Sequence, residues 1–289
     1  MDIHGFLTAH HLPSSYADTA QMWFIPLCEQ LLKHQKSAKQ PFIVGINGCQ
    51  GSGKSTLTSF IETFLKSEHD MRVVSLSIDD FYLDKDHRNA LAIKVHPLLK
   101  TRGVPGTHNI PLALNTFAML EKGERTQLPR FDKSTDNPFP TSQWPVMDAV
   151  PDVIILEGWC VGVSPQESSA LTHPVNELES EEDSLCTWRS FVNSELGNQY
   201  QTLFNKIDYS VMLAAPSFDS VLHWRLEQEH KLAKTSKGEK TGVMNDEEVA
   251  RFIEHYQRLT EHALSTLPQQ CDTVFFLDEH RNITQQDLK

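Results

Sequence analysis

The sequence lacks paired cysteines. Five cysteines are scattered over 289 residues, their number is odd, and no C-x-x-C motif is present. Disulfide-rich extracellular domains carry an even number of cysteines, and structural zinc sites need closely spaced ones. The pattern argues against both classes and predicts a reduced protein of the cytoplasm.

Positive charge is also scarce. The chain has 26 Lys and Arg residues against 38 Asp and Glu residues, which gives a formal net charge of −12. A protein that binds nucleic acid or a membrane surface needs a basic face. We therefore expect neither partner, whereas a small anionic substrate in a local basic pocket is compatible with this charge. The composition gives no basis for predicting an oligomeric state.

Long apolar runs are missing as well. No segment approaches the length of a membrane span, and the first residues, "MDIHGFLTAHHLP", show none of the features of a signal peptide. Hydrophobic residues nevertheless make up 39% of the chain, which is enough for one large domain with insertions.

Short apolar segments alternate with helical patterns along the chain. Buried strands are predicted at residues 41–47, 71–78, 152–158, 208–215 and 272–278. Helices are predicted at residues 54–67, 111–123, 191–207, 217–234 and 245–267. This alternation predicts an α/β fold with a five-stranded parallel sheet that is covered by helices on both faces.

Two further segments carry predictions about organisation. Residues 1–40 are expected to form an N-terminal helical segment ahead of one domain at 41–289, and Pro26 is expected to bend or break a helix there. The acidic run "ELESEED" at 177–183 is expected to be a solvated loop, because blocks of like charge usually are.

The stretch "GINGCQGSGKST" contains the P-loop pattern G-x-x-x-x-G-K-[ST], placed between a predicted strand and a predicted helix. Glycines allow a tight loop whose N–H groups point at phosphate oxygens, Lys54 adds positive charge, and the Ser55 hydroxyl is suited to Mg²⁺. The expected nucleotide-binding residues are Gly48, Cys49, Gln50, Gly51, Ser52, Gly53, Lys54, Ser55 and Thr56.

A P-loop occurs in GTPases, mechanical ATPases and small-molecule kinases. Residues 205–208, "NKID", fit the guanine-binding signature of GTPases, but they precede a strand instead of following one. Ligands bind at the carboxyl ends of parallel strands, so this segment is on the wrong edge of the sheet. No D-x-x-G motif follows the P-loop either, and the GTPase interpretation is therefore disfavoured.

Acidic residues follow two predicted strands at the ligand edge. Glu157 ends the strand "VIILEG" and is the expected second Mg²⁺ contact beside Ser55. Asp79 and Asp80 follow the strand "MRVVSLSI", and a kinase needs a carboxylate there to orient an acceptor hydroxyl and take its proton. Neighbouring side chains of an extended chain point in opposite directions, so the two aspartates are not expected to share one role.

The order of the motifs is familiar. After the P-loop come "DDFYLD", "RGVPGTH", "PRFDKS", "LEGWCVG" and "HWRLEQE". From about residue 40 onward the chain resembles microbial relatives of the plant-type D-glycerate 3-kinase family. That family lies within the P-loop kinases that include uridine kinase, phosphoribulokinase and bacterial pantothenate kinase. The sequence departs from the plant pattern after "PRFDKS" and between "EGW" and the fourth strand.

The resemblance implies roles for particular residues. Asp79 takes the catalytic aspartate position, Lys54 and Arg225 are the other catalytic residues, and residues 231–245 form a lid with Gly238 and Gly242 as hinge points. The residues implied to bind the acceptor are Asp79, Tyr82, Arg102, His108, Arg130, Lys133 and Trp159. The implied cofactors are ATP and Mg²⁺.

The expected activity is transfer of the γ-phosphoryl group of MgATP to a hydroxyl, most simply that of D-glycerate, giving 3-phosphoglycerate. Another small acceptor that resembles pantothenate, a nucleoside or a sugar is the first alternative. An ATP-binding regulatory protein without a small-molecule acceptor is the second.

Overall fold

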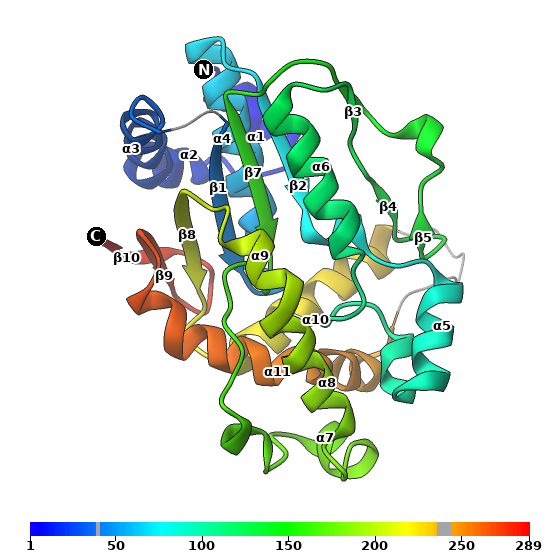
Figure 1. The fold of residues 1–289 in the computed structure, drawn as a ribbon. Helices are drawn as coiled ribbons and strands as arrows, with labels where there is room; N and C mark the ends of the chain where they lie inside the picture. Colours follow the sequence, from blue (N-terminus) through cyan, green and yellow to red (C-terminus); the bar gives the residue numbers. More distant parts are fainter. Residues whose placement is uncertain (39–40, 236–243) are drawn as a thin grey trace.

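A six-stranded sheet, five of whose strands are parallel, forms the centre of the molecule (Figure 1). The computed structural model describes residues 1–38, 41–235 and 244–289. The strands are β1 (Phe42–Gly48), β2 (Val73–Ser77), β7 (Val153–Gly158), β8 (Tyr209–Ala214), β9 (Thr273–Leu277) and β10 (Ile283–Leu288). Their order across the sheet is β10-β9-β8-β1-β7-β2. The five predicted strands and the α/β class are confirmed.

Strand β10 was not predicted. It pairs antiparallel with β9 at the edge of the sheet, and its sequence "ITQQDL" is polar, with no fully buried residue. Strand patterns are recognised from buried apolar residues, and an exposed edge strand lacks them.

The helical segments are α1 (Ile3–Ala9), α2 (Tyr16–Thr19), η1 (Ala20–Phe24), α3 (Ile25–Gln35), α4 (Lys54–His69), η2 (Ile78–Phe81), α5 (Lys85–Lys94), η3 (Pro97–Lys100), α6 (Ile110–Lys122), η4 (Thr141–Gln143), η5 (Ser168–Leu171), α7 (Glu177–Glu182), α8 (Thr187–Glu195), η6 (Leu196–Tyr200), α9 (Gln201–Phe204), α10 (Phe218–Thr235), α11 (Asp246–Thr266) and η7 (Leu267–Gln269). Two small hairpins lie outside the main sheet. They are formed by β3 (Thr126–Gln127) with β6 (Val146–Met147), and by β4 (Phe131–Asp132) with β5 (Asn137–Pro138). None of the described helices is long and apolar enough to cross a membrane.

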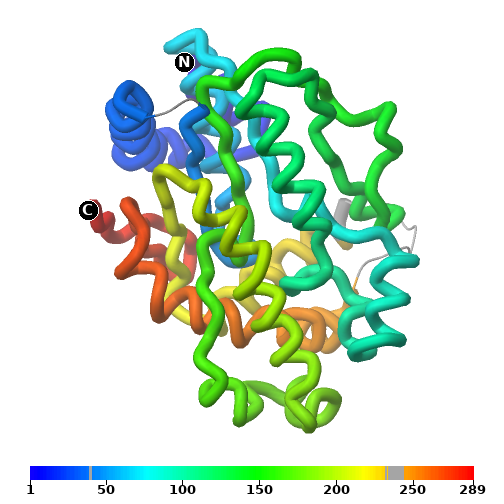
Figure 2. The backbone as a smooth tube through the Cα atoms, viewed as in Figure 1, coloured from blue at the N-terminus to red at the C-terminus, as the bar shows by residue number. Residues whose placement is uncertain are grey.

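Helices cover both faces of the sheet. The N-terminal helices and α4 pack on one face, where the Phe24 ring contacts Phe60 of α4 and Phe275 of β9. Figure 2 shows this blue N-terminal segment beside the red C-terminal strands. Helices α6 and α9 lie over the other face (Figure 1), where a Cβ on Gly45 of β1 would meet Ile207 at 2.5 Å. The division of the chain at residue 40 stays a prediction.

Pro26 does not end the N-terminal helical run. Residues 16–35 stay helical, and the π-helical turn η1 directly precedes α3, whose first turn contains Pro26. Proline is tolerated in a first turn because its missing N–H is not needed there. The expected break is therefore replaced by a local widening of the helix.

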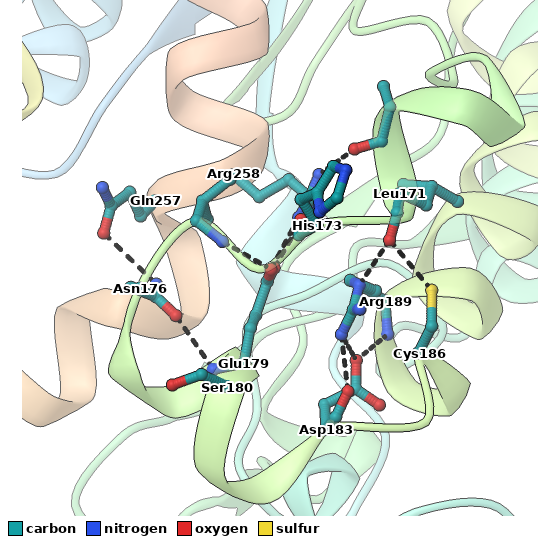
Figure 3. A network of polar contacts seen from close by, with 12 residues as sticks. Leu171, His173, Asn176, Glu179, Ser180, Asp183, Cys186, Arg189, Gln257 and Arg258 are labelled. Carbon is teal, nitrogen blue, oxygen red and sulfur yellow. Dashed lines mark hydrogen bonds and ion pairs between the residues drawn. The ribbon is translucent and has the colours of Figure 1, made fainter.

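The prediction of a solvated loop at 177–183 is wrong. Helix α7 covers Glu177–Glu182, and the Asn176 side chain caps it by accepting the Glu179 N–H at 3.0 Å. Glu179 and Asp183 are buried and pair with Arg258 of α11 and Arg189 of α8 (Figure 3). Glu179 and Asp183 of the acidic run thus form buried ion pairs, and the other acidic residues of the run are exposed to solvent.

Candidate active site

The P-loop connects the carboxyl end of β1 to the first turn of α4. Gly51 and Gly53 adopt φ angles of +79° and +92°, which side chains rarely allow. A Cβ on Gly51 would lie 2.7 Å from the Cβ of Trp224, so the loop packs directly against α10. The Trp224 indole N–H donates a hydrogen bond to the Glu279 carbonyl at 2.7 Å, which holds the ring in place. The tryptophan next to Arg225 therefore holds α10 against the phosphate loop.

A cavity of about 600 Å³ adjoins this loop. Its volume is within the usual range for small-molecule sites. It is lined by Gly51, Ser52, Gly53, Lys54, Ser55 and Thr56, by His11, Leu12, Pro13, Ser15, Tyr16 and Thr19, by Gln228 and Lys231, and by His280, Arg281 and Asn282. The N-terminal segment and the β9–β10 turn were not predicted to line this site, because neither carries a recognisable motif.

Cys49 is the one thiol in the phosphate loop. It is buried, and burial raises the pKa of this thiol to about 12 despite the positive charge of Lys54. The group is therefore a protonated packing residue at neutral pH. None of the five cysteines, all of which the structure describes, forms a disulfide.

The predicted metal-binding residues lie together at the end of the phosphate loop. The Ser55 hydroxyl donates to Glu157 Oε1 at 3.4 Å, and Lys54 Nζ lies 3.8 Å from Glu157 Oε2. Glu157 is only 8% exposed and stands opposite Ser77 in the β2–β7 register. A hydroxyl and a carboxylate beside a phosphate loop form a donor set that suits Mg²⁺, which retains phosphate and water ligands. The residues therefore fit this metal.

Asp79 stands at the end of β2, in the 3₁₀ turn η2. Its carboxylate accepts the Tyr82 hydroxyl at 2.8 Å and the Lys133 ammonium at 2.7 Å. Burial would raise the pKa of Asp79, but the charges of Lys133 and Lys54 and these hydrogen bonds outweigh burial and lower the pKa to about 2. Asp79 is therefore ionised at neutral pH and lies within the electrostatic reach of the phosphate-loop lysine.

Asp80 points elsewhere, as expected. Its carboxylate accepts the Ser77 N–H at 3.0 Å and so closes a capping box on η2. It also pairs with Arg130 at 3.3 Å. Arg130 further donates to the carbonyls of Ser75 and Pro129. These contacts give Asp80 and Arg130 a structural role in holding the turn that presents Asp79.

The other expected acceptor cations lie around the β4–β5 hairpin. Lys133 is in the turn of this hairpin, and its side chain is 61% exposed. Arg102 pairs with Asp136 of the same turn and lies 5.6 Å from the centre of the Phe131 ring. The site therefore combines one exposed ammonium, paired with Asp79, and one half-buried guanidinium, paired with Asp136 of the hairpin turn.

Aromatic residues support the loop that carries Arg102 and His108. A Cβ on Gly103 would lie 2.2 Å from the Tyr256 hydroxyl, which donates to the Arg102 carbonyl at 3.1 Å. The Trp159 indole N–H donates to the Gly103 carbonyl at 3.1 Å. The one polar group of Trp159 is thus committed to this loop. Tyr256 was not predicted, since "EHYQRL" carries no motif.

Arg225 lies on α10, where its guanidinium pairs with Glu229 at 2.6 Å and stands 5.8 Å from the centre of the Phe252 ring. The Glu229 carboxylate also accepts the Met244 N–H at 2.9 Å. The proposed hinge glycines, Gly238 and Gly242, lie outside the described residues.

The guanine-type signature lies at the opposite end of the sheet. The Asp208 N–H donates to the Ile43 carbonyl at 2.8 Å, and the Asp208 carboxylate accepts the Ile43 N–H at 2.8 Å, at the start of β1. The P-loop follows the other end of that strand. Asp208 is therefore a strand connector, and the GTPase interpretation finds no support in the geometry.

Comparison with known proteins agrees with this geometry. Residues 43–166 match the model of the phosphoribulokinase/uridine kinase family. A Schizosaccharomyces pombe protein described as "Uncharacterized kinase mug58" is 38% identical over 268 residues, which cover 87% of this chain and 93% of that protein. The chain belongs to the phosphoribulokinase/uridine kinase family. It is therefore a P-loop kinase, and its fold and motifs are those of this family.

Two relatives of this kinase are D-glycerate 3-kinases. The chloroplastic enzyme of Arabidopsis thaliana is 28% identical over 287 residues, which cover 90% of this chain but 59% of that protein. The structure of the Cryptococcus neoformans enzyme superposes with a TM-score of 0.76 at 26% identity and covers 96% of this chain and 100% of that one.

Proposed function

We propose that this kinase transfers the γ-phosphoryl group of MgATP to a hydroxyl of D-glycerate, giving 3-phosphoglycerate and ADP. The observation that carries the proposal is the Asp79–Lys133 contact of 2.7 Å at the edge of the phosphate loop. Lys133 is exposed enough for an anionic acceptor to reach its ammonium. The two D-glycerate 3-kinases among the relatives support the choice of this acid.

The nucleotide half of the site follows from the phosphate loop. Backbone N–H groups of the loop and Lys54 would bind the β- and γ-phosphates, and Ser55 and Glu157 would hold Mg²⁺. The metal, when bound, neutralises charge on the phosphates. We place the base and ribose against the part of the cavity wall that is formed by His11, Leu12, Pro13, Ser15, Tyr16, Thr19 and residues 280–282.

The acceptor half follows from Asp79. The acceptor hydroxyl oxygen would attack the γ-phosphorus while the bond to the β-phosphate oxygen breaks, and the hydroxyl proton would pass to the Asp79 carboxylate. A carboxylate with a pKa of about 2 is a weak base, so its main contribution is to orient the hydroxyl. Lys133 and Arg102 would hold the acceptor carboxylate, and Arg225 would turn from Glu229 to the transferring group.

The acceptor is tested directly by a panel. We expect ADP release with D-glycerate and MgATP, and much less with pantothenate, uridine or ribulose 5-phosphate. Turnover with another acceptor and none with D-glycerate would replace the acceptor but keep the kinase. Nucleotide binding without turnover on any acceptor would favour a regulatory protein instead.

The role of Lys133 provides a second test. Lys133→Met should raise the KM for D-glycerate by a factor on the order of 10, because a charge-assisted contact contributes about 1.5–3 kcal/mol. Lys94→Met is the matched control, since Lys94 is exposed at the end of α5. Equal KM values for the two variants would remove Lys133 from the acceptor site.

The expectations of a cytoplasmic location and of no nucleic-acid or membrane partner are part of the same proposal.

A further inference from the structure

Tyr200 sits in an unusual backbone segment near the acceptor site. It ends the segment η6, which is a kink between α8 and α9 where Asn198 has non-helical φ and ψ angles of −100° and −120°. The Tyr200 side chain is 1% exposed. The distorted turn thus delivers a buried hydroxyl to the loop that carries His108.

The hydrogen bonds of this hydroxyl determine its direction. Gly106 N–H donates to Tyr200 Oη at 2.9 Å, and Tyr200 Oη lies 2.6 Å from His108 Nδ1. The hydroxyl oxygen can accept two hydrogen bonds but has one proton to donate, and among the described residues His108 Nδ1 is the acceptor within reach of that proton. Burial raises the pKa of Tyr200 well above its ordinary value, so the hydroxyl keeps this proton. The proton of Tyr200 is therefore donated to His108 Nδ1.

The tautomer of His108 follows from this bond. A neutral imidazole whose Nδ1 accepts a hydrogen bond carries its proton on Nε2. Burial lowers the pKa of His108 to about 4, although the Asp79 charge opposes the shift, so the ring is neutral at physiological pH. His108 therefore offers one N–H donor and no positive charge.

This donor has no partner among the described residues, although it is buried. An unsatisfied buried donor costs about 1–3 kcal/mol, so such a group usually has a use. The His108 ring stacks on the Tyr82 ring with 4.5 Å between the ring centres, and the Tyr82 hydroxyl donates a hydrogen bond to Asp79. The unpaired donor thus belongs to the group of side chains that surrounds the proposed phosphoryl acceptor.

We propose that Tyr200 is a positioning residue that holds His108 as the neutral Nε2–H tautomer, so that this N–H donates to an oxygen of the acceptor beside Asp79. The proposal rests on the proposed function, because it assumes an acceptor with oxygen ligands. It gives His108, which the resemblance places among the acceptor-binding residues, the specific role of a neutral hydrogen-bond donor.

The first experiment reads the tautomer. In ¹⁵N-labelled wild-type protein the long-range ¹H–¹⁵N spectrum should show His108 protonated at Nε2, with assignment by comparison with His108→Leu. Tyr200→Phe should give a mixture of tautomers. A wild-type His108 protonated at Nδ1 would overturn the proposal. The measurement on the wild-type protein requires neither a substrate nor a Tyr200 variant that folds.

The second experiment separates positioning from stability. Tyr200→Phe should raise the KM for D-glycerate about 10-fold, as expected for one hydrogen bond, and leave the KM for ATP unchanged. Tyr209→Phe is the matched control, because Tyr209 is also 1% exposed and its hydroxyl makes a bond of 2.7 Å to Thr273 on the β8–β9 pair. Equal effects of the two variants on the acceptor KM would overturn the proposal.

A double variant tests whether Tyr200 acts through His108. Adding Tyr200→Phe to His108→Leu should cause no further rise in the acceptor KM, since the mediating ring is already gone. Additive effects would overturn the positioning role. If the panel identifies another acceptor, the same comparison is made with it. The failure of D-glycerate as a substrate is thereby distinguished from a failure of the Tyr200 proposal.

Discussion

At the scale of single residues, two neighbouring aspartates have opposite surroundings. Asp79 faces Lys133 and Tyr82, whereas Asp80 caps η2 and pairs with Arg130. The 3₁₀ turn after β2 produces this division, because it rotates the first carboxylate toward the phosphate loop and the second back toward the strand. The sequence predicted the division from the alternation of side chains along an extended chain, whereas both aspartates lie in a 3₁₀ turn, which separates them in another way.

Asp79→Asn should keep ATP binding but lower kcat by a factor on the order of 10²–10⁴, because the amide neither orients nor accepts the hydroxyl proton in the same way. Steady-state kinetics and nucleotide titration measure the two effects. Asp80→Asn is the control, and it should act mainly on stability by weakening the capping box and the contact with Arg130. An active Asp79→Asn together with an inactive Asp80→Asn would reverse the assignment.

His108 should make the free energy of unfolding depend on pH. Its pKa is lowered to about 4 in the folded protein, so below the unfolded value of 6.5 the unfolded chain binds more protons. Stability must then fall as pH falls from about 6.5 toward 4. Between about pH 7.5 and pH 5 the loss from this ring is about 2 kcal/mol.

Urea unfolding of the wild type and His108→Gln at both pH values isolates this contribution, since the other histidines are common to both proteins. The wild type should lose more stability on acidification than the variant does. Parallel pH dependence in the two proteins would show that His108 titrates normally in the fold.

At the scale of elements, the phosphate loop depends on its contact with α10. Gly51→Ala should abolish tight ATP binding, because the new Cβ would lie 2.7 Å from Trp224 Cβ at a φ of +79°. Gly162→Ala is the matched control. It has a similar φ of +80°, but its nearest neighbour would be 4.0 Å away. Both alanines would occupy a backbone conformation that side chains rarely adopt, but only the alanine at position 51 would also clash with a neighbour. Nucleotide titration should therefore show a large loss of ATP affinity for Gly51→Ala and little change for Gly162→Ala.

The sequence predicted the elements that contain a run of buried apolar residues and the loop that carries a phosphate-binding motif. Strands β1, β2, β7, β8 and β9 and the residues of the P-loop belong to this group. Strand β10, helix α7 and the contact of Tyr200 with His108 do not. Each of these depends on a partner distant in sequence, and local patterns contain no information on such a partner.

At the scale of the whole molecule, buried ion pairs attach the insertion after β7 to the body of the kinase. Arg258 of α11 makes two bonds to the Glu179 carboxylate, of 2.7 and 2.6 Å, and donates to the carbonyls of Ala170 and His173 (Figure 3). Arg189 of α8 similarly binds Asp183 and the Leu171 carbonyl. The two arginines add buried ion pairs to the apolar contacts that Leu178 and Trp188 of this insertion make with the core.

Glu179→Gln should lower the free energy of unfolding by about 3 kcal/mol, because it leaves the Arg258 charge buried without its counter-ion. Glu181→Gln, on the exposed side of the same helix, should change it by less than about 0.5 kcal/mol. Urea unfolding measures both. Since Glu179 contacts neither the phosphate loop nor Asp79, kcat should be unaffected while the protein remains folded. Similar stability losses in the two variants would show that the charge of Glu179 is not what secures the insertion, and a lower kcat in Glu179→Gln alone would show that α7 influences the active site through α11.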